Sequence, residues 1–355
     1  MRILNVADFN WMTGRERDVT GLRLFDLCRK ITMAATRADH LVVEFSDRSV
    51  ARTGAPLRLR ALGAGAASRR FLQVVDEFQP QLILLHFADA ITNDALGEAR
   101  RLSPGVAIAD INIDPIDFAR NKRRLARRKG AVDGLFVTTA EPALAANVGA
   151  TAFAAYLPNP VDPAVETGRG FETDRPQFHL VLPVFGEAPR SIGAQSMTPT
   201  RAARMLIREV PDLRLSTPGA DGQPAASGYG YFMALRSARA GWSLSKVANR
   251  PLYASDRMAH FFGWGLLVVM ERAAGFERFY GPDEAVFYDD FEGLAHAARR
   301  IAADDSWARA VAENGWRKTW TLFNSGRVLH YLLAQLFDEG GAAGYEWPCE
   351  RWGAK

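Results

Sequence analysis

The sequence predicts an α/β protein built from two doubly wound parallel sheets. In both halves of the chain, apolar runs of strand length alternate with amphipathic segments of helix length, as is typical of such sheets. Between the halves, residues 157–163 hold three prolines in seven residues, which cannot continue a helix or a central strand. The 355 residues are enough for two domains, each able to bury its own sheet.

The first half begins with a strand and continues the alternation. Apolar runs and helical periodicity predict strands at residues 2–6, 41–45, 82–87, 106–113 and 134–138, and helices at residues 22–36 and 68–78. Strand, helix and strand in this order predict parallel pairing with right-handed crossovers.

Candidate ligand residues lie at the ends of these strands, where open α/β sheets bind ligands. His86 ends an apolar run and is a candidate base or ligand-binding residue, or else a capping histidine hydrogen-bonded to the next loop. Asp114 is either catalytic or the helix-capping residue before Pro115. Gly14 and Arg15 follow the first strand and could let the backbone approach a ligand phosphate, with an ordinary turn as the alternative.

The second half repeats the pattern after the proline-rich segment. We expect strands at residues 178–185 and 213–216 and helices at residues 199–209 and 232–239. A strand-like segment that ends near Lys246 follows.

Residues 255–290 are the most informative segment. Ser255 or Asp256 can cap a helix whose first turn carries Arg257, and Gly265 follows where that helix ends. Exposed N–H groups, the positive end of the helix dipole and one guanidinium converge at the helix start. This arrangement suits a diphosphate.

Two glutamates follow the same helix. An apolar run at residues 266–270 predicts a buried parallel strand, with Glu271 at its carboxyl end, where ligands bind. Glu284 lies in a Gly-Pro-Asp-Glu turn. Both glutamates are candidate contacts for a ligand, each with surface solvation as the alternative.

The segment resembles the CgeB-like family of GT-B glycosyltransferases. The positions that match the family pattern are Ser255, Asp256, Arg257, Gly265, Glu284 and Tyr288. The resemblance implies a GT-B architecture of two Rossmann-like domains facing a central cleft, with residues 157–163 as the hinge. The expected parts are an acceptor-side domain at residues 1–160, a nucleotide-sugar donor domain at 161–325, and a helix crossing back to the first domain with a tail at 326–355. Under this resemblance, His86, Gly14 and Arg15 could bind the acceptor. Glu271 would contact a sugar hydroxyl, and Glu284 a ribose or sugar.

Two further residues take their roles from this resemblance. Lys246 matches a family segment near the donor cleft. His260 stands where better-known members carry a glutamate, which in related retaining enzymes holds the nucleotide ribose. His260 lies one turn after Arg257, so it could donate to a ribose or phosphate oxygen, or else cover the inner face of the helix.

Composition and charge are those of an ordinary globular protein, with 48% hydrophobic and 24% charged residues and a net charge of +4. No apolar run approaches the roughly 20 residues of a membrane span, and the start lacks a signal-peptide pattern, so we expect a cytoplasmic protein. On a helix, the basic run at residues 122–129 would present cations on most of its circumference, which suits peripheral contact with an anionic membrane or a solvated face. It lacks interleaved aromatics, which argues against nucleic acid.

We expect neither a metal nor a cofactor. The two cysteines have no metal-binding spacing, and Asp110, Asn112 and Asp114 alternate along a strand whose faces are normally covered by helices.

The expected function is therefore a metal-independent glycosyltransferase of the hexosyltransferase type. It would move a sugar from a UDP-, GDP- or dTDP-sugar to a glycan, lipid-linked or protein acceptor in bacterial surface polysaccharide biosynthesis. A sugar-nucleotide 2-epimerase of the same architecture and a non-catalytic nucleotide- or glycan-binding scaffold are the alternatives.

Overall fold

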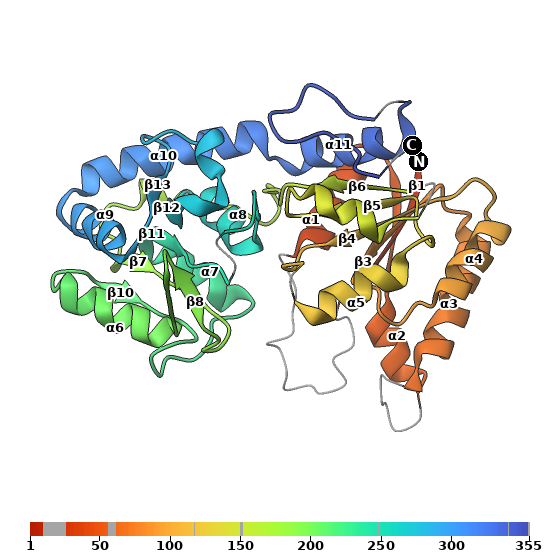
Figure 1. The fold of residues 1–355 in the computed structure, drawn as a ribbon, viewed down its shortest axis with the longest axis horizontal. Helices are drawn as coiled ribbons and strands as arrows, with labels where there is room; N and C mark the ends of the chain where they lie inside the picture. The colour runs from red at the N-terminus through yellow and green to blue at the C-terminus, as the bar shows by residue number, and fades with distance from the viewer. Residues whose placement is uncertain are drawn as a thin grey trace. The chain divides into compact units, whose positions relative to one another are not determined.

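The computed structural model describes residues 1–9, 26–55, 62–116, 118–149, 152–246, 249–339 and 341–353. The chain forms two compact units, a first unit of Met1–Pro158 with Ser325–Lys355 and a second unit of Asn159–Asn324. Each unit is built around its own parallel sheet (Figure 1).

The first unit contains a six-stranded sheet in the order β2-β1-β3-β4-β5-β6, and all five neighbouring pairs are parallel. Its strands are β1 (Arg2–Ala7), β2 (Leu41–Ser46), β3 (Leu82–His86), β4 (Ala107–Asn112), β5 (Gly134–Val137) and β6 (Phe153–Tyr156). The sequence pattern predicts all of them except β6. The chain changes direction across the sheet between β1 and β3, which makes the carboxyl ends of these two strands the topological switch point.

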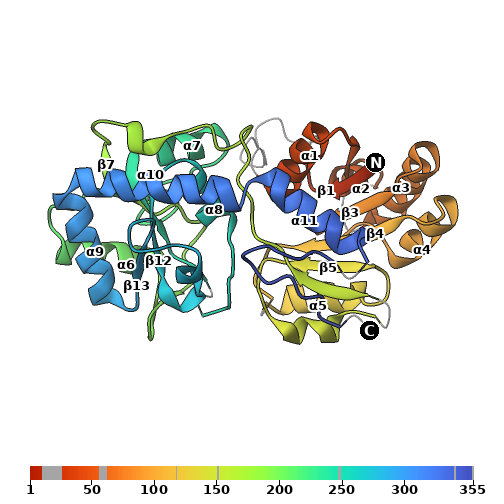
Figure 2. The same ribbon diagram turned by 90° about the horizontal axis from the view of Figure 1, so that it is seen from above.

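Helices cover both faces of this sheet. They are α1 (Leu27–Arg37), α2 (Asp47–Thr53), α3 (Ala64–Phe78), α4 (Asn93–Leu102), α5 (Ala119–Arg128), the 3-10 helix η4 (Pro142–Asn147) and α11 (Ser325–Phe337). Helix α3 contacts both α2 and α4, and α11 lies beside α1 (Figure 2). Residues 22–25 of the predicted first helix lie outside the described part of the chain.

Alternating side chains of the strands face these two helical layers. Leu4 and Leu85 pack in one apolar core with Phe71 of α3, whereas the neighbouring Asn5 points to the other face. There its amide donates to the carbonyl of Cys28 in α1, at 2.9 Å. The buried sheet therefore presents different residues to each layer, and this alternation decides which side chains meet at the switch point.

The second unit contains a five-stranded parallel sheet in the order β10-β7-β11-β12-β13. Its strands are β7 (Phe178–Val181), β10 (Leu215–Ser216), β11 (Ala238–Ser243), β12 (Leu267–Glu271) and β13 (Val286–Tyr288), with an added hairpin of β8 (Arg190–Ile192) and β9 (Gln195–Met197). Its helices are α6 (Pro199–Glu209), α7 (Tyr229–Arg236), α8 (Asp256–Gly263), α9 (Phe291–Ala303) and α10 (Asp305–Leu322), with short 3-10 turns η5 (Gly170–Glu172), η6 (Arg272–Ala274) and η7 (Phe276–Arg278).

The two sheets share one topology. In each unit the second strand lies on one side of the first strand and the later strands follow on the other side, so the second switch point lies between β7 and β11. The predicted α/β class with two parallel sheets is confirmed. None of the described helices combines the length and the hydropathy that a membrane-spanning helix requires.

Candidate functional site

The start of α8 lies at the carboxyl edge of the second sheet and is capped as the sequence predicts. The Ser255 hydroxyl accepts a hydrogen bond from the backbone N–H of Met258, at 3.3 Å. Asp256 in the first turn accepts from the side-chain amide of Asn159, at 2.5 Å. These two contacts hold the helix start in place at the edge where the sheet would bind a ligand.

Arg257 reaches from α8 to the switch point itself. Its two terminal nitrogens donate to the carbonyl of Pro183, at 3.0 Å, and to that of Leu244, at 2.6 Å, in the loops that follow β7 and β11. Burial lowers the pKa of Arg257. Its Nε is buried and has no hydrogen-bond partner among the described residues, which leaves one donor of the guanidinium unused.

Arg190 is a second buried cation at this edge, and the sequence pattern does not indicate it. The side chain starts β8 and is only 5% exposed. Burial and, to a smaller extent, the nearby charge of Arg257 together lower the pKa of Arg190 to about 10. Its Nε has no hydrogen-bond partner in the described part of the chain, and the charge of Glu187 raises the pKa of Arg190 less than burial and Arg257 lower it. Two neighbouring buried cations whose charge is not balanced by an ion pair are costly, so the arrangement favours binding of an anion.

Glu271 closes β12 at the same edge. Its Oε1 accepts a hydrogen bond from the backbone N–H of Gly193, at 3.0 Å, in the turn of the β8–β9 hairpin. Gly193 has a φ of 56°, and a Cβ there would lie 2.6 Å from the carbonyl oxygen of Asp289, so the turn requires glycine. The second oxygen, Oε2, is buried with no partner among the described residues, and burial raises the pKa of Glu271. It can therefore accept a hydrogen bond from a ligand or, when protonated, donate one.

A small cavity of about 20 Å³ lies beside Glu271. Its polar lining is rich in hydroxyl groups, which belong to Ser243, Ser245, Tyr253 and Ser255. Hydroxyl and carboxyl groups around a common cavity can form hydrogen bonds with ribose or sugar hydroxyls.

Glu284 does not join this group, although the sequence suggested a similar role for both glutamates. It lies in the loop before β13, at the amino end of that strand, whereas Glu271 lies at the carboxyl end of β12. Its Oε2 accepts from the backbone N–H of Gly281, at 2.8 Å, and Lys318 lies 3.4 Å from Oε1. Glu284 therefore stabilises a turn on the opposite edge of the sheet.

Lys246 and Gly265 take different positions around the site. Lys246 is exposed in the loop after β11, at the carboxyl edge. Gly265 lies between α8 and β12 with a φ of 71°, and a Cβ there would lie 2.7 Å from the ring of Phe171. The glycine is thus required by the turn and by close packing, and its role is to let the chain pass from the helix into the strand.

His260 faces the interior of the second unit. Its Nδ1 lies 2.6 Å from the carboxylate of Glu166, and both side chains are at most 1% exposed. The other carboxylate oxygen accepts from the backbone N–H of Asp162, at 2.7 Å, while the rings of Tyr231 and Phe232 contact the imidazole edge to face. This position favours the interpretation in which His260 covers the inner face of α8.

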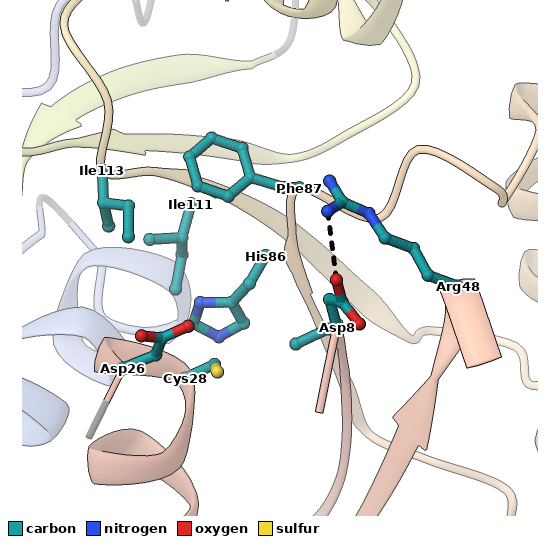
Figure 3. A pocket seen from close by; sticks show the side chains of 9 residues that line it. Asp8, Asp26, Cys28, Arg48, His86, Phe87, Ile111 and Ile113 are labelled. Carbon is teal, nitrogen blue, oxygen red and sulfur yellow. Dashed lines mark hydrogen bonds and ion pairs between the residues drawn. The ribbon is translucent and has the colours of Figure 1, made fainter. Parts of the chain in front are cut away.

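The first unit has its own cavity at the switch point between β1 and β3, with a volume of about 30 Å³ (Figure 3). It is lined by His86 at the end of β3, Asp8 after β1, Arg48, and Asp26 and Cys28 at the start of α1. The volume is that of about one water molecule, so the cavity can accept a single polar group.

His86 is the most buried polar residue of this cavity. It is 6% exposed, and its Nε2 has no hydrogen-bond partner in the parts of the chain that the structure describes. Burial lowers the pKa of His86 to about 3, so the imidazole is neutral near pH 7. A neutral ring with one unused nitrogen is a hydrogen-bonding group for a ligand hydroxyl, and its low proton affinity makes it a weak base.

The residue after His86 has an unusual backbone conformation. Phe87 has a φ of 51°, a value that is rare for a bulky side chain. The turn directs His86 into the cavity, while Asp89 leaves in another direction and forms an ion pair with Arg48. Such conformations are costly and are found preferentially at functional sites.

The other sequence-based candidates of the first unit are less constrained. Asp114 is exposed beyond β4, and its backbone carbonyl accepts from the amide of Asn112, at 3.0 Å. It does not cap α5, whose N-cap residue is Phe118. Gly14 and Arg15 lie outside the described residues.

The sequence suggested that the basic run at residues 122–129 presents its cations to solvent on most of the helix circumference, but the structure buries two of them. The run lies largely on α5, and the side chains of Arg124 and Arg128 are buried against polar groups of the sheet edge. Lys122 and Arg123 face solvent. The helical spacing of four residues between Arg124 and Arg128 could have indicated one inward-facing cationic row.

No group of three or more histidine, cysteine, aspartate or glutamate side chains in the described ranges is arranged to hold a metal ion.

Comparisons with known proteins bear on the second unit and on the fold. Residues 200–334 match a family described as glycosyl transferase-like. The matched residues include α8, Glu271 and their surroundings. The chain therefore carries the sequence pattern of that family over most of its second unit. No curated protein matches the sequence.

Solved structures share the fold at low sequence identity. HepE of Anabaena, in complex with UDP and glucose, is 14% identical over 94% of this chain and 98% of its own, with a TM-score of 0.54. AviGT4, a glycosyltransferase involved in avilamycin A biosynthesis, is 14% identical over 94% of this chain and 96% of its own, with a TM-score of 0.56. The N-terminal domain of trehalose-6-phosphate phosphatase from Candida albicans is 8% identical over 93% of this chain and 95% of its own, with a TM-score of 0.55. These similarities identify the fold as that of GT-B glycosyltransferases.

Proposed function

We propose that the protein is a glycosyltransferase that uses a nucleotide sugar as its donor. The observation that carries the proposal is the pair of buried cations at the carboxyl edge of the second sheet, Arg190 and Arg257, whose Nε atoms have no hydrogen-bond partner in the described part of the chain. A diphosphate would supply the missing negative charge and accept hydrogen bonds from both guanidiniums. The glycosyl transferase-like match at residues 200–334 and the fold shared with AviGT4 support this reading.

In the proposed reaction, the bond between the anomeric carbon and the phosphate oxygen of the donor breaks, and the nucleoside diphosphate leaves with the electron pair. A hydroxyl oxygen of the acceptor forms a new bond to that carbon, and its proton passes to a base or to solvent. Arg190, Arg257 and the N-terminus of α8 stabilise the charge that develops on the diphosphate. We propose that these groups act without a metal ion.

The donor contacts follow from the polar groups at the same edge. Glu271 has a buried oxygen available to a ribose or sugar hydroxyl, and hydroxyl side chains line the adjacent cavity. Lys246 and Asp256 complete the proposed donor site from the loop after β11 and the start of α8. UDP is the first nucleotide to test, because HepE was solved with UDP-glucose and shares the fold.

We place the acceptor on the first unit, where the neutral His86 would bind its hydroxyl, with Asp114 beyond the neighbouring strand. We further propose that the acceptor is a glycan, a lipid-linked molecule or a protein in bacterial surface polysaccharide assembly. We also propose that the protein belongs to the CgeB-like subfamily. Contact with an anionic membrane through residues 122–129 also stays a prediction, with Lys122 and Arg123 as exposed cations.

The test is incubation of the protein with UDP-, GDP- and dTDP-sugars, with and without candidate acceptors, followed by product analysis. We expect one donor to release its nucleoside diphosphate and to form a new glycoside. A changed sugar still attached to the diphosphate would instead identify an epimerase. A thermal shift with a nucleotide, but no product of either kind, would identify a binding scaffold. A ligand at a hundred times its Kd adds about 2.7 kcal/mol of stability even without turnover. No shift with any nucleotide would contradict the proposal.

A further inference from the structure

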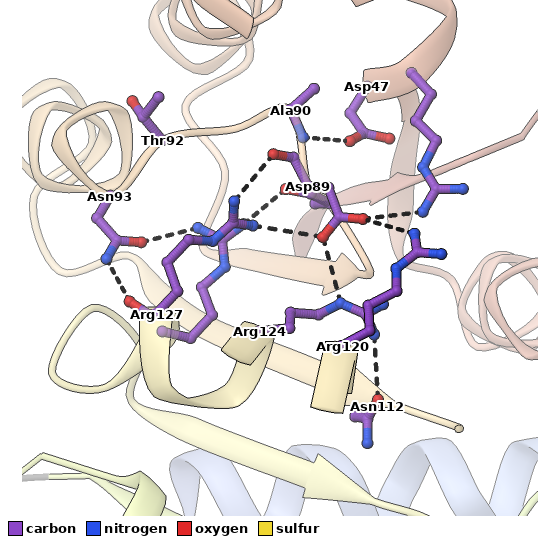
Figure 4. Close-up of polar contacts among 12 residues, drawn as sticks. Asp47, Asp89, Ala90, Thr92, Asn93, Asn112, Arg120, Arg124 and Arg127 are labelled. Carbon is purple, nitrogen blue, oxygen red and sulfur yellow. Dashed lines mark hydrogen bonds and ion pairs between the residues drawn. The ribbon is translucent and has the colours of Figure 1, made fainter. Parts of the chain in front are cut away.

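Four arginines of the first unit form ion pairs with the carboxylate of Asp89, and Figure 4 labels Arg120, Arg124 and Arg127 among them. Arg48 lies 3.1 Å from this carboxylate, Arg124 3.3 Å, and Arg120 and Arg127 each 3.5 Å. Burial alone would raise the pKa of Asp89, but the four positive charges lower it below its usual value. We call Asp89 with these four arginines the Asp89 cluster.

Positive charge exceeds negative charge in and around the Asp89 cluster. Arg128 adds a fifth guanidinium, which donates to the carbonyl of Ala88, at 2.7 Å. Besides Asp89, the neighbouring carboxyl groups are those of Asp8, Asp47, Asp110 and Asp114. Burial raises the pKa of Asp110, and it raises that of Asp47 to about 6, which shifts both toward the neutral form. Five guanidinium groups therefore face five carboxyl groups, two of which carry less than a full negative charge, so positive charge remains in excess.

The arginines of the cluster differ in exposure, and this difference gives them separate tasks. Arg124 is 6% exposed, lies 3.7 Å from the centre of the Phe87 ring and donates to the side chain of Asn112. Arg120 and Arg127 are 66% and 43% exposed. The inner arginine is thus held rigidly by its contacts, while the two outer guanidiniums direct remaining N–H donors to solvent.

The spacing of residues along α5 decides which of its cations contact Asp89. Arg120, Arg124 and Arg127 lie three or four residues apart and so share one face of the helix. Lys122 and Arg123 are exposed on α5 and take no part in the ion pairs of Asp89. The surplus charge is therefore concentrated at the edge of the sheet that also holds the His86 cavity.

We infer that Arg120 and Arg127 bind an oxyanion, of the phosphate type, carried by the acceptor. Asp89 is a positioning residue: it holds the guanidiniums in place and leaves their outer N–H donors available. The acceptor class that fits is a phosphate ester or diphosphate whose hydroxyl-bearing part reaches His86. The inference deepens the proposed function and rests on it for the assignment of this unit to the acceptor.

Inorganic pyrophosphate is the probe for this subsite, titrated into the full-length protein in a calorimeter. We expect the Arg120→Gln/Arg127→Gln double variant to raise the Kd at least about tenfold. The matched control is Lys122→Gln/Arg123→Gln, which removes the same charge from the same helix and should change the Kd less than about twofold. Circular dichroism of both variants checks that these exposed substitutions leave the fold intact.

Two further measurements make the outcome specific. The variant Arg190→Gln removes a cation of the donor site only, so binding that it retains and the α5 double variant loses belongs to the Asp89 cluster. If wild-type protein shows no nucleotide binding but this difference persists, the proposed donor fails and the anion subsite stands. Equal weakening by both α5 double variants, or binding to anionic phosphatidylglycerol vesicles that depends equally on both pairs, would overturn the subsite and indicate a general cationic surface.

Discussion

The two sheets have the same strand order, yet they arrange charge differently at their switch points. In the first unit, Arg48 lies between the carboxylates of Asp8 and Asp89, and the neutral His86 lies in the cavity beside them. In the second unit, Arg190 and Arg257 lie close together, and the Nε of each has no hydrogen-bond partner in the described residues. Topology therefore places a polar site at both edges, but the side chains decide what each edge can bind.

The largest expected effect concerns the interior of the second unit. His260→Ala would leave the buried carboxylate of Glu166 without its imidazole partner, and breaking such a buried pair costs about 3–5 kcal/mol. Urea titration should show this loss in the free energy of unfolding. The matched control is His296→Ala on the exposed side of α9, expected within about 0.5 kcal/mol of wild type.

The same variant separates two interpretations of His260. If His260→Ala kept its stability within about 1 kcal/mol but lost UDP binding, the side chain would be a donor contact, as its position in the family pattern first suggested.

A smaller effect should appear in the pH dependence of the first unit. Because the pKa of His86 is about 3 in the folded protein and 6.5 ordinarily, the unfolded chain takes up a proton that the folded chain does not. The stability from His86 is therefore complete above pH 6.5 and is lost as the pH falls, by about 2 kcal/mol at pH 5.

Thermal unfolding of wild type and of His86→Leu between pH 7.5 and pH 5 measures this effect. Other titrating groups, among them Asp47, are common to both proteins and cancel in the comparison. Wild type should lose the greater stability on acidification. Parallel curves for the two proteins would show that His86 is not held neutral by its cavity.

The smallest expected effect distinguishes the two edges of the second sheet. Glu271→Gln keeps an acceptor for the N–H of Gly193 but changes the buried oxygen, so kcat/KM for the donor should fall about fivefold, which corresponds to about 1 kcal/mol. Glu284→Gln, at the opposite edge, should leave kcat/KM unchanged. If kcat/KM fell further for Glu284→Gln than for Glu271→Gln, the donor would bind at the amino edge of the sheet and our assignment would be wrong.

Much of the fold follows from the sequence because buried parallel strands read as apolar runs between amphipathic helices. The cap at Ser255 and the position of Arg257 were likewise predictable, because helix starts have a local chemical signature. These features depend on residues that are close in the chain.

The remaining features depend on contacts between distant residues. Arg190 lies in a short hairpin without strong periodicity, and its proximity to Arg257 arises only from folding. The partner of His260 lies 94 residues earlier in the chain. Glu284 was a candidate because of its neighbours in the sequence, although it precedes its strand and so lies at the amino edge. Local patterns do not contain this information.

Calorimetric titration of UDP into wild type, Arg190→Gln and Arg208→Gln tests the central claim most directly. Arg208 is an exposed residue of α6 and controls for the loss of one positive charge. Because Arg190 is buried and its Nε has no hydrogen-bond partner in the described residues, its replacement should leave the stability of the unliganded protein unchanged or higher while raising the Kd for UDP about tenfold or more. Equal UDP affinity in all three proteins would contradict the claim that the second unit binds a nucleoside diphosphate with Arg190.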